Sequence, residues 1–346
     1  MILVDSKGVE MLLDIFENIV KKGQPPSNNE IDNLLPAASI SFMVESYSRW
    51  PDFSREGFVN VIANLANTKI YSDGVLSRLE DGFRFCLDEK KIKSLRQKVK
   101  EIVKVDFSKS EGLALTYLPP NTALKCTIYL TIDKVNPGMI YKGNISLSIL
   151  DFVAERFDFS YLAHELHHSG FQYWTARNPA LKSLFSDEIG THEQIAVNMV
   201  LNLLSEGMAN HYCTPNMVRV HPEAGDKHNR KIREYERNFP RMWLQIQSLL
   251  SDCVMKTASA SACKEQLMSI VLDPEYVLPP VHFIGVRIIQ MFEMEPTIKR
   301  EEIINLCKEP SQFFSLYSKI NQKNSLTMFP DIVAEKTCNL LRSSVD

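Results

Sequence analysis

The sequence predicts a mainly α-helical α+β protein in which helical regions at both ends flank a small antiparallel sheet. Apolar residues recur at helical spacing through most of the chain, whereas one stretch near 124–149 alternates apolar and polar residues as half-buried strands do. At 346 residues the chain is long enough to bury a substantial core, and it contains no repeat and no low-complexity linker. We therefore expect three regions, residues 1–118, 119–218 and 219–346, with the sheet in the second.

Helical periodicity predicts the elements outside the sheet. The expected helices span about 6–22, 28–50 with a break near Pro36, 54–67, 73–87, 89–104, 159–175, 191–212, 227–256, 260–271, 280–293 and 299–320. The helix at 89–104 carries many lysines, but its apolar residues keep helical spacing, so the lysines are interpreted as its solvated face. With a net charge of −3, the chain shows no overall preference for nucleic acid or for an anionic membrane.

Alternation predicts two short strands. Apolar residues alternate with Thr and Tyr over 126–132, and with Asn and Ser over 144–149. Pro137 and Gly138 between them are typical of a turn. We predict that the two strands pair as a hairpin within residues 124–149.

Residues 164–168 read His-Glu-Leu-His-His, which is the pattern H-E-x-x-H. On an α-helix, His164 and His168 lie on one face, about 6 Å apart along the axis. That spacing allows two neutral imidazoles to bind one Zn²⁺. Glu165 lies about 100° further round the helix, where it can reach a water on the metal without being a ligand. The adjacent His167 points elsewhere, and we interpret it as a supporting or surface histidine.

The residues around this motif are compatible with a helix. Asp158 and Ser160 are both candidates to cap its start. Leu162 and Leu166 repeat at i, i+4 on the side opposite the histidines, so that side is suited to packing. Gly170 either ends the helix or allows another part of the chain to approach it closely.

A third ligand is expected in the segment Leu-Leu-Ser-Glu-Gly-Met-Ala-Asn at 203–210. Its helix begins with Thr191-His-Glu-Gln194, which fits a capping box, and is apolar on nearly all sides. One polar row nevertheless runs along it at i, i+4 spacing: Asn198, Asn202, Glu206 and Asn210. A buried carboxylate needs a partner, so Glu206 is the candidate ligand. Gly207 and Ala209 are small enough to allow close packing against another helix.

The combination of His-Glu-x-x-His with Glu-Gly-x-Ala resembles the gluzincin metallopeptidases. More narrowly, the segment 203–210 is similar to the second motif of an uncharacterised bacterial family assigned as zinc-dependent peptidases. The resemblance spans about residues 120–320 and implies a zincin-like core. In gluzincins the third ligand is a glutamate on a following helix, which corresponds to Glu206. A polar side chain four residues later orients a ligand histidine, which corresponds to Asn210.

The resemblance implies a zinc-dependent peptidase with one Zn²⁺ per chain and a peptide or protein substrate. The metal would activate a water for attack on the peptide carbonyl, with Glu165 as the general base. The oxyanion donor would be a Tyr or His on a later helix, for which His282 is the first choice and Tyr276 the second. His211 and Tyr212 are further candidates to line the cleft, which we expect between the second and third regions.

Gluzincins also use a strand before the zinc helix as an edge that pairs with the substrate. An exposed edge offers unpaired N–H and C=O groups to an extended peptide. The resemblance therefore implies that the strand formed by Asn144, Ile145, Ser146 and Leu147 lines the cleft. The simpler interpretation is a hairpin that covers the core, and the two are compatible.

Two other classes of protein fit parts of this pattern. Glu165-x-x-His168 is also the E-x-x-H motif of di-iron and di-manganese bundles, but these need a second such motif, which the chain lacks. The alternative that remains is a non-catalytic zinc-binding or interaction protein that retains a zincin fold. Glu165 argues against it, because a structural zinc site closes its fourth position and has no use for a base.

Seven cysteines without a C-x-x-C pair are typical of reduced, buried thiols rather than of a disulfide framework. No apolar run reaches the ~18 residues of a membrane span. The first residues lack the pattern of a signal peptide. We therefore expect a cytoplasmic protein without a membrane span, or an exported one if a leader preceding residue 1 has been removed.

Overall fold

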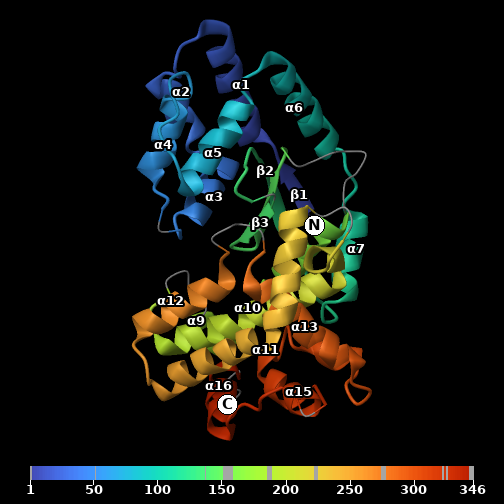
Figure 1. The fold of residues 1–346 in the computed structure, drawn as a ribbon. Helices are drawn as coiled ribbons and strands as arrows, with labels where there is room; N and C mark the ends of the chain where they lie inside the picture. Colours follow the sequence, from blue (N-terminus) through green and yellow to red (C-terminus); the bar gives the residue numbers. More distant parts are fainter. Residues whose placement is uncertain are drawn as a thin grey trace. The chain divides into compact units, whose positions relative to one another are not determined.

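The computed structural model describes residues 2–50, 52–136, 138–150, 159–184, 189–221, 225–273, 278–321, 323–324 and 326–342. It confirms the predicted fold class, because the chain is α+β and mainly helical with one small sheet (Figure 1). The chain divides into two compact units, the first formed by residues 1–109 and 124–159 and the second by residues 110–123 and 160–346. The expected division into three regions stays a prediction.

In chain order, the first unit contains β1 (Ile2–Asp5), α1 (Lys7–Lys22), α2 (Asn28–Leu34), α3 (Ala38–Tyr47), α4 (Arg55–Ala63), α5 (Gly74–Phe85), α6 (Glu89–Ile102), β2 (Cys126–Thr131), β3 (Gly138–Tyr141) and β4 (Asn144–Ser148). The second contains most of α7 (Ser108–Thr116) and α8 (Phe159–Thr175), then α9 (Pro179–Leu184), α10 (His192–Tyr212), η2 (Pro215–Val218), α11 (Asp226–Met255), α12 (Ala260–Val271), α13 (Pro280–Met294), α14 (Arg300–Asn305), η3 (Pro310–Gln312), α15 (Phe313–Ile320) and α16 (Asp331–Leu341). None of the described helices is both long and apolar enough to cross a lipid bilayer. All seven cysteines lie in the described part of the chain and are free thiols, six of them buried.

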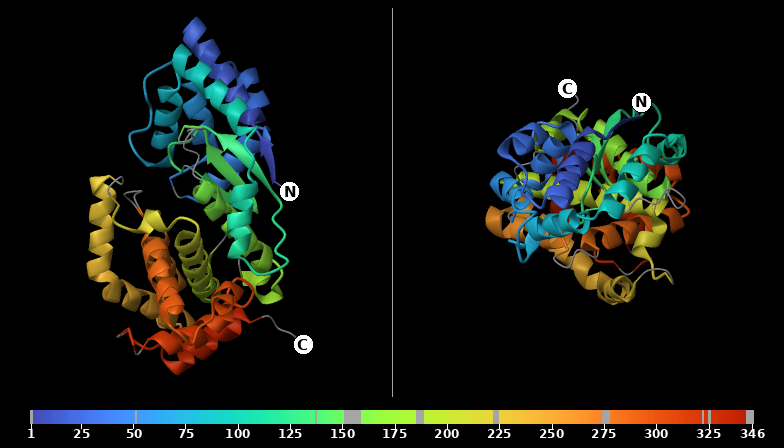
Figure 2. Two further views of the ribbon diagram at one scale, coloured as in Figure 1. Left: turned by 90° about the vertical axis from the view of Figure 1, so that its right-hand side faces the viewer. Right: turned by 90° about the horizontal axis from the view of Figure 1, so that it is seen from above.

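Helix α1 illustrates how periodicity builds the first unit. Its apolar side chains Leu12, Leu13 and Phe16 are fully buried, whereas the lysines of its last turn are exposed. Gly23 ends the helix in the left-handed conformation, with φ of 63°, where glycine has no steric penalty. Helices α1 and α6 pack side by side, as the views in Figures 1 and 2 show.

The sheet of the first unit is mixed, with strand order β1-β2-β4-β3. Strands β1 and β4 run parallel to β2, and β3 runs antiparallel to β4. Lys142 and Gly143 form the loop between β3 and β4, and their φ angles of 48° and 74° are typical of a tight hairpin turn. The predicted hairpin between 126–132 and 144–149 is therefore wrong. These segments are parallel neighbours, because the chain first forms β3 and only then returns to pair β4 with β2.

The strand predicted to be an edge lies inside the sheet. Strand β4, with Asn144, Ile145, Ser146 and Leu147, has β2 on one side and β3 on the other. Its backbone groups are thus engaged within the chain, and Ile145, Ser146 and Leu147 are buried. Among the described strands the edges are β1 and β3. The prediction that this strand is a free edge, able to pair with a substrate, is therefore wrong.

In the second unit, helices α10 and α13 touch at a pair of glycines. An ideal Cβ built on Gly285 would lie 2.5 Å from the carbonyl oxygen of Leu203 and 2.7 Å from Cα of Gly207. A Cβ built on Gly207 would lie 2.7 Å from the carbonyl carbon and oxygen of Gly285. Neither position has room for a side chain, so the two backbones are in direct contact. This contact brings Glu206, the neighbour of Gly207, close to the helix that carries His282.

We expect Gly285→Ala to lower the free energy of unfolding by about 1–3 kcal/mol, because the added methyl group meets backbone atoms that cannot rotate away. Chemical denaturation of wild type and variant measures this change. The control is Gly112→Ala in α7, where an ideal Cβ meets nothing within 4 Å. That substitution should stabilise the protein by roughly 0.5–1 kcal/mol through helix propensity. Equal effects of the two substitutions would contradict the importance of the glycine contact.

Candidate metal centre

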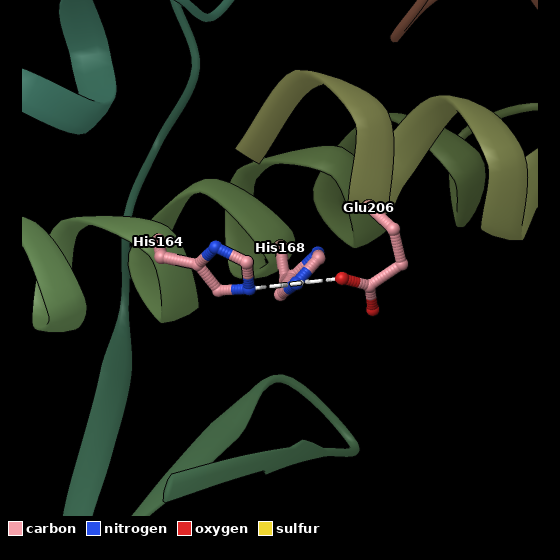
Figure 3. Close-up of side chains that lie close together, drawn as sticks. All are labelled: His164, His168 and Glu206. Carbon is pink, nitrogen blue, oxygen red and sulfur yellow. Dashed lines mark hydrogen bonds and ion pairs between the residues drawn. The ribbon is translucent and has the colours of Figure 1, made fainter. Parts of the chain in front are cut away.

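Helix α8 carries the H-E-x-x-H motif. Leu162 and Leu166 are fully buried, as expected for the packing side of the helix. His164 and His168 project together from another side toward Glu206 (Figure 3). Ser160 lies in the first turn of α8, and Asp158, the other candidate cap, lies outside the described residues.

Residues 117–122 pack along α8. His167 is completely buried, and its Nε2 lies 3.0 Å from the carbonyl oxygen of Tyr117. Burial lowers the pKa of His167 to about 3, so the imidazole is neutral. An ideal Cβ at Gly170 would lie 2.3 Å from a methyl group of Leu118, so this glycine makes room for a neighbouring side chain and does not end the helix. His167 is thus a buried histidine in contact with this segment, and the interpretation as a surface residue is wrong.

Helix α10 has the capped start and the row of polar side chains that the sequence predicts. Thr191 and Gln194 form the predicted capping box. Much of the polar row is satisfied by the helix itself, because the side-chain amides of Asn198, Asn202 and Asn210 each donate to the carbonyl oxygen four residues earlier. Glu206, whose side chain is 20% exposed, is the carboxylate of the row and requires a different partner.

The two histidines of α8 and Glu206 of α10 form a compact cluster. The Nε2 atoms of His164 and His168 lie 2.9 Å apart. Glu206 Oε2 lies 3.7 Å from the first and 3.4 Å from the second. One potential ligand atom from each residue thus lies within 4.8 Å of the others (Figure 3). It is the one such group of three or more His, Cys, Asp or Glu side chains among the residues that the structure describes.

The chemistry of these donors fits zinc. Two imidazole nitrogens and a carboxylate oxygen form a ligand set of catalytic zinc sites. The Nδ1 atoms of the two rings are already engaged, 3.0 Å from Thr214 Oγ1 for His164 and 2.7 Å from Ser205 Oγ for His168. The two Nε2 atoms therefore face one point, where their lone pairs could both bind a single cation.

Burial and neighbouring charges favour the metal-binding protonation states of His164 and Glu206. For His168, burial lowers the pKa, but the charge of Glu206 outweighs it and raises the pKa of this imidazole above its usual value. Burial, followed by the charge of His168, holds the pKa of His164 well below its usual range, which favours the neutral ring. Burial opposes ionisation of Glu206, but the charges of His282 and His168 outweigh it and hold the pKa of this carboxyl well below its usual range. Burial raises the pKa of Glu165 to about 7, although the charge of His168 acts in the opposite direction.

Helix α13 brings His282 to the same place. Its Nδ1 lies 3.2 Å from Glu206 Oε2 and 3.0 Å from Asn210 Nδ2. Its ring is nearly parallel to that of His164, with the centroids 6.5 Å apart. Asn210, expected to orient a ligand histidine, contacts Glu206, Thr214 and His282 instead of either histidine of α8. Tyr276, the second candidate oxyanion donor, lies outside the described residues.

His211 and Tyr212, the other candidates to line the cleft, both contact Glu293. The distances are 3.1 Å from His211 Nε2 and 3.1 Å from the Tyr212 hydroxyl to its carboxylate oxygens. The sequence interpretation missed Ser205 and Thr214, the two hydroxyl residues behind the histidines. Ser205 directly precedes Glu206, and Thr214 follows the end of α10, but neither position carries a sequence signal of its own.

Two buried histidines from an H-E-x-x-H helix and a half-buried glutamate from a second helix define a candidate metal-binding protein of the H-E-x-x-H class. The chain belongs to the family described as "Putative zinc dependent peptidase (DUF5700)", whose model matches residues 18–326. The match begins within α1, so it extends well beyond the residues 120–320 for which a resemblance was expected. Neither a curated protein nor a solved structure matches the chain.

Proposed function

We propose that this chain hydrolyses peptide bonds as a gluzincin-like zinc peptidase, with one Zn²⁺ held by His164, His168 and Glu206. The observation that carries the proposal is the convergence of these three donor atoms within 4.8 Å, from the two motifs that the sequence singles out. Membership of a family described as zinc-dependent peptidases supports both the metal and a peptide or protein substrate.

Zinc bound by these ligands supplies a Lewis acid that polarises the peptide carbonyl and makes water more acidic. Glu165 is buried beside the ligands on α8 but is not part of the cluster. As a carboxylate next to the metal ligands but not one of them, Glu165 would take the proton from the attacking water and deliver it to the leaving amine. The Asn210 amide nitrogen lies 3.0 Å from His282 Nδ1 and can only donate to it, so the neutral ring would carry its proton on Nε2. That Nε2–H would donate a hydrogen bond to the developing oxyanion.

The first test is metal content together with chelation. We expect one Zn²⁺ per chain by elemental analysis after purification with zinc. We also expect that a chelator abolishes cleavage of an unbiased peptide mixture and that added Zn²⁺ restores it. A chain that took up no transition metal would contradict the proposal, as would cleavage that survives removal of the metal. Zinc binding without any cleavage would favour the alternative, a non-catalytic zinc-binding or interaction protein.

A further inference from the structure

The Nδ1 atoms of the two histidines in the cluster contact hydroxyl groups and not carboxylates. Thr214 Oγ1 lies 3.0 Å from His164 Nδ1, and both residues are almost completely buried, 5% and 4% exposed. A hydroxyl can either donate or accept, so this contact alone leaves the position of the histidine proton open. The remaining contacts of Thr214 decide it.

The orientation of the Asn210 amide is set by the backbone. Asn210 is completely buried, and its Nδ2 lies 2.9 Å from the carbonyl oxygen of Glu206. A carbonyl oxygen only accepts hydrogen bonds, so the atom facing it is the amide nitrogen. The amide oxygen then faces Thr214, with Oδ1 3.3 Å from Oγ1. Because an amide oxygen also only accepts, Thr214 donates its single hydroxyl proton to Asn210.

This direction fixes the proton on His164. A hydroxyl that has donated its proton to Asn210 can only accept from the imidazole, so Nδ1 of His164 carries the hydrogen. Nε2 then keeps the lone pair that a metal requires. The other tautomer would place two acceptors face to face, 3.0 Å apart, in a site that water scarcely reaches.

We propose that Thr214 is a positioning residue, which fixes the tautomer and orientation of His164 through a directional chain from the Glu206 carbonyl to Asn210, Thr214 and His164. The inference rests on the metal site of the proposed function but not on peptide hydrolysis. Asn210 was expected to contact a ligand histidine directly. In this proposal it acts on His164 through the hydroxyl group of Thr214.

The test compares two substitutions of Thr214. Thr214→Val keeps the shape of the side chain and removes the hydroxyl, whereas Thr214→Ser keeps the hydroxyl. Competition with a chelator should show that the Zn²⁺ dissociation constant rises by about 10–100-fold in Thr214→Val and is restored toward the wild-type value in Thr214→Ser. The matched control is Thr175→Val in α8, which removes a buried hydroxyl that donates to the Phe171 carbonyl. Its zinc affinity should equal that of the wild type.

Nitrogen NMR of ¹⁵N-histidine-labelled protein supplies a second readout that a purely structural role would not change. His164 should carry its proton on Nδ1 in the wild type and in Thr214→Ser, with or without zinc. Metal-free Thr214→Val should show the Nε2-protonated form.

Three results would overturn the inference: an Nε2 proton on His164 in the wild type, an unchanged zinc affinity in Thr214→Val, or an equal loss in Thr214→Ser. If the wild type bound no zinc, the proposed function would fail, whereas the spectrum of the metal-free protein would still decide this inference.

Discussion

Replacing Glu165 by Gln is expected to slow peptide hydrolysis by about 10²–10⁴-fold while the protein still binds one Zn²⁺ per chain. Gln has nearly the same size but cannot take up the proton of the attacking water. The cluster of potential ligands does not include Glu165, so the substitution leaves the donor atoms in place. Initial rates on cleaved peptides and elemental analysis of the same preparation measure the two quantities.

Glu193→Gln provides a control with the same change of charge. Glu193 lies in the first turn of α10, where its side chain is 36% exposed and pairs with Lys256 at 2.9 Å. Such surface pairs contribute only about 0–1 kcal/mol, so this variant should keep both zinc and activity. A Glu165→Gln protein as active as the wild type would exclude Glu165 as the base. Loss of zinc from that variant would instead indicate that Glu165 supports the metal.

His282→Ala is expected to lower turnover by about 10²–10³-fold, because it removes the proposed hydrogen-bond donor to the oxyanion. Zinc should remain bound, since His282 contacts Glu206 without belonging to the cluster. A donor that acts mainly on the transition state changes kcat more than KM. Steady-state kinetics on one cleaved peptide would separate the two.

His192→Ala is the matched control for this experiment. Its Nε2 lies 2.8 Å from the carbonyl oxygen of Ala258, at the opposite end of α10 from Asn210. It should therefore leave zinc content and turnover unchanged. A His282→Ala variant with wild-type kcat would contradict the assignment, and a variant without zinc would show that His282 is needed for metal binding.

The candidate metal site could be predicted to a large extent because its signals are local. His164 and His168 are one helical turn apart, so residue type and spacing sufficed. Glu206 stood out as a carboxylate on an otherwise apolar helix. The proximity of His282 depends on the contact between Gly207 and Gly285, two residues far apart in sequence. Periodicity cannot show such a contact, and only the resemblance pointed to His282.

The strand pairing could not be predicted, because it is set by contacts between distant segments. Strands β1 and β3 have four residues each, too few for alternation to identify them. Without these two neighbours, β4 looked like one strand of a hairpin with a free edge.

The helix expected at 299–320 is a different case, because it is split into α14, η3 and α15. Pro310 marks the break, since proline lacks the N–H that a helix interior needs.

The long stretch of chain between the paired strands β1 and β2 has a consequence for biosynthesis. Strand β1 (Ile2–Asp5) leaves the ribosome well before its partner β2, which begins only at Cys126. At about 5–20 residues per second, roughly 6–24 s pass before the two can pair. During that interval the nascent chain exposes an unpaired apolar strand. Until β2 has been made, this strand is open to association with a chaperone or with another nascent chain.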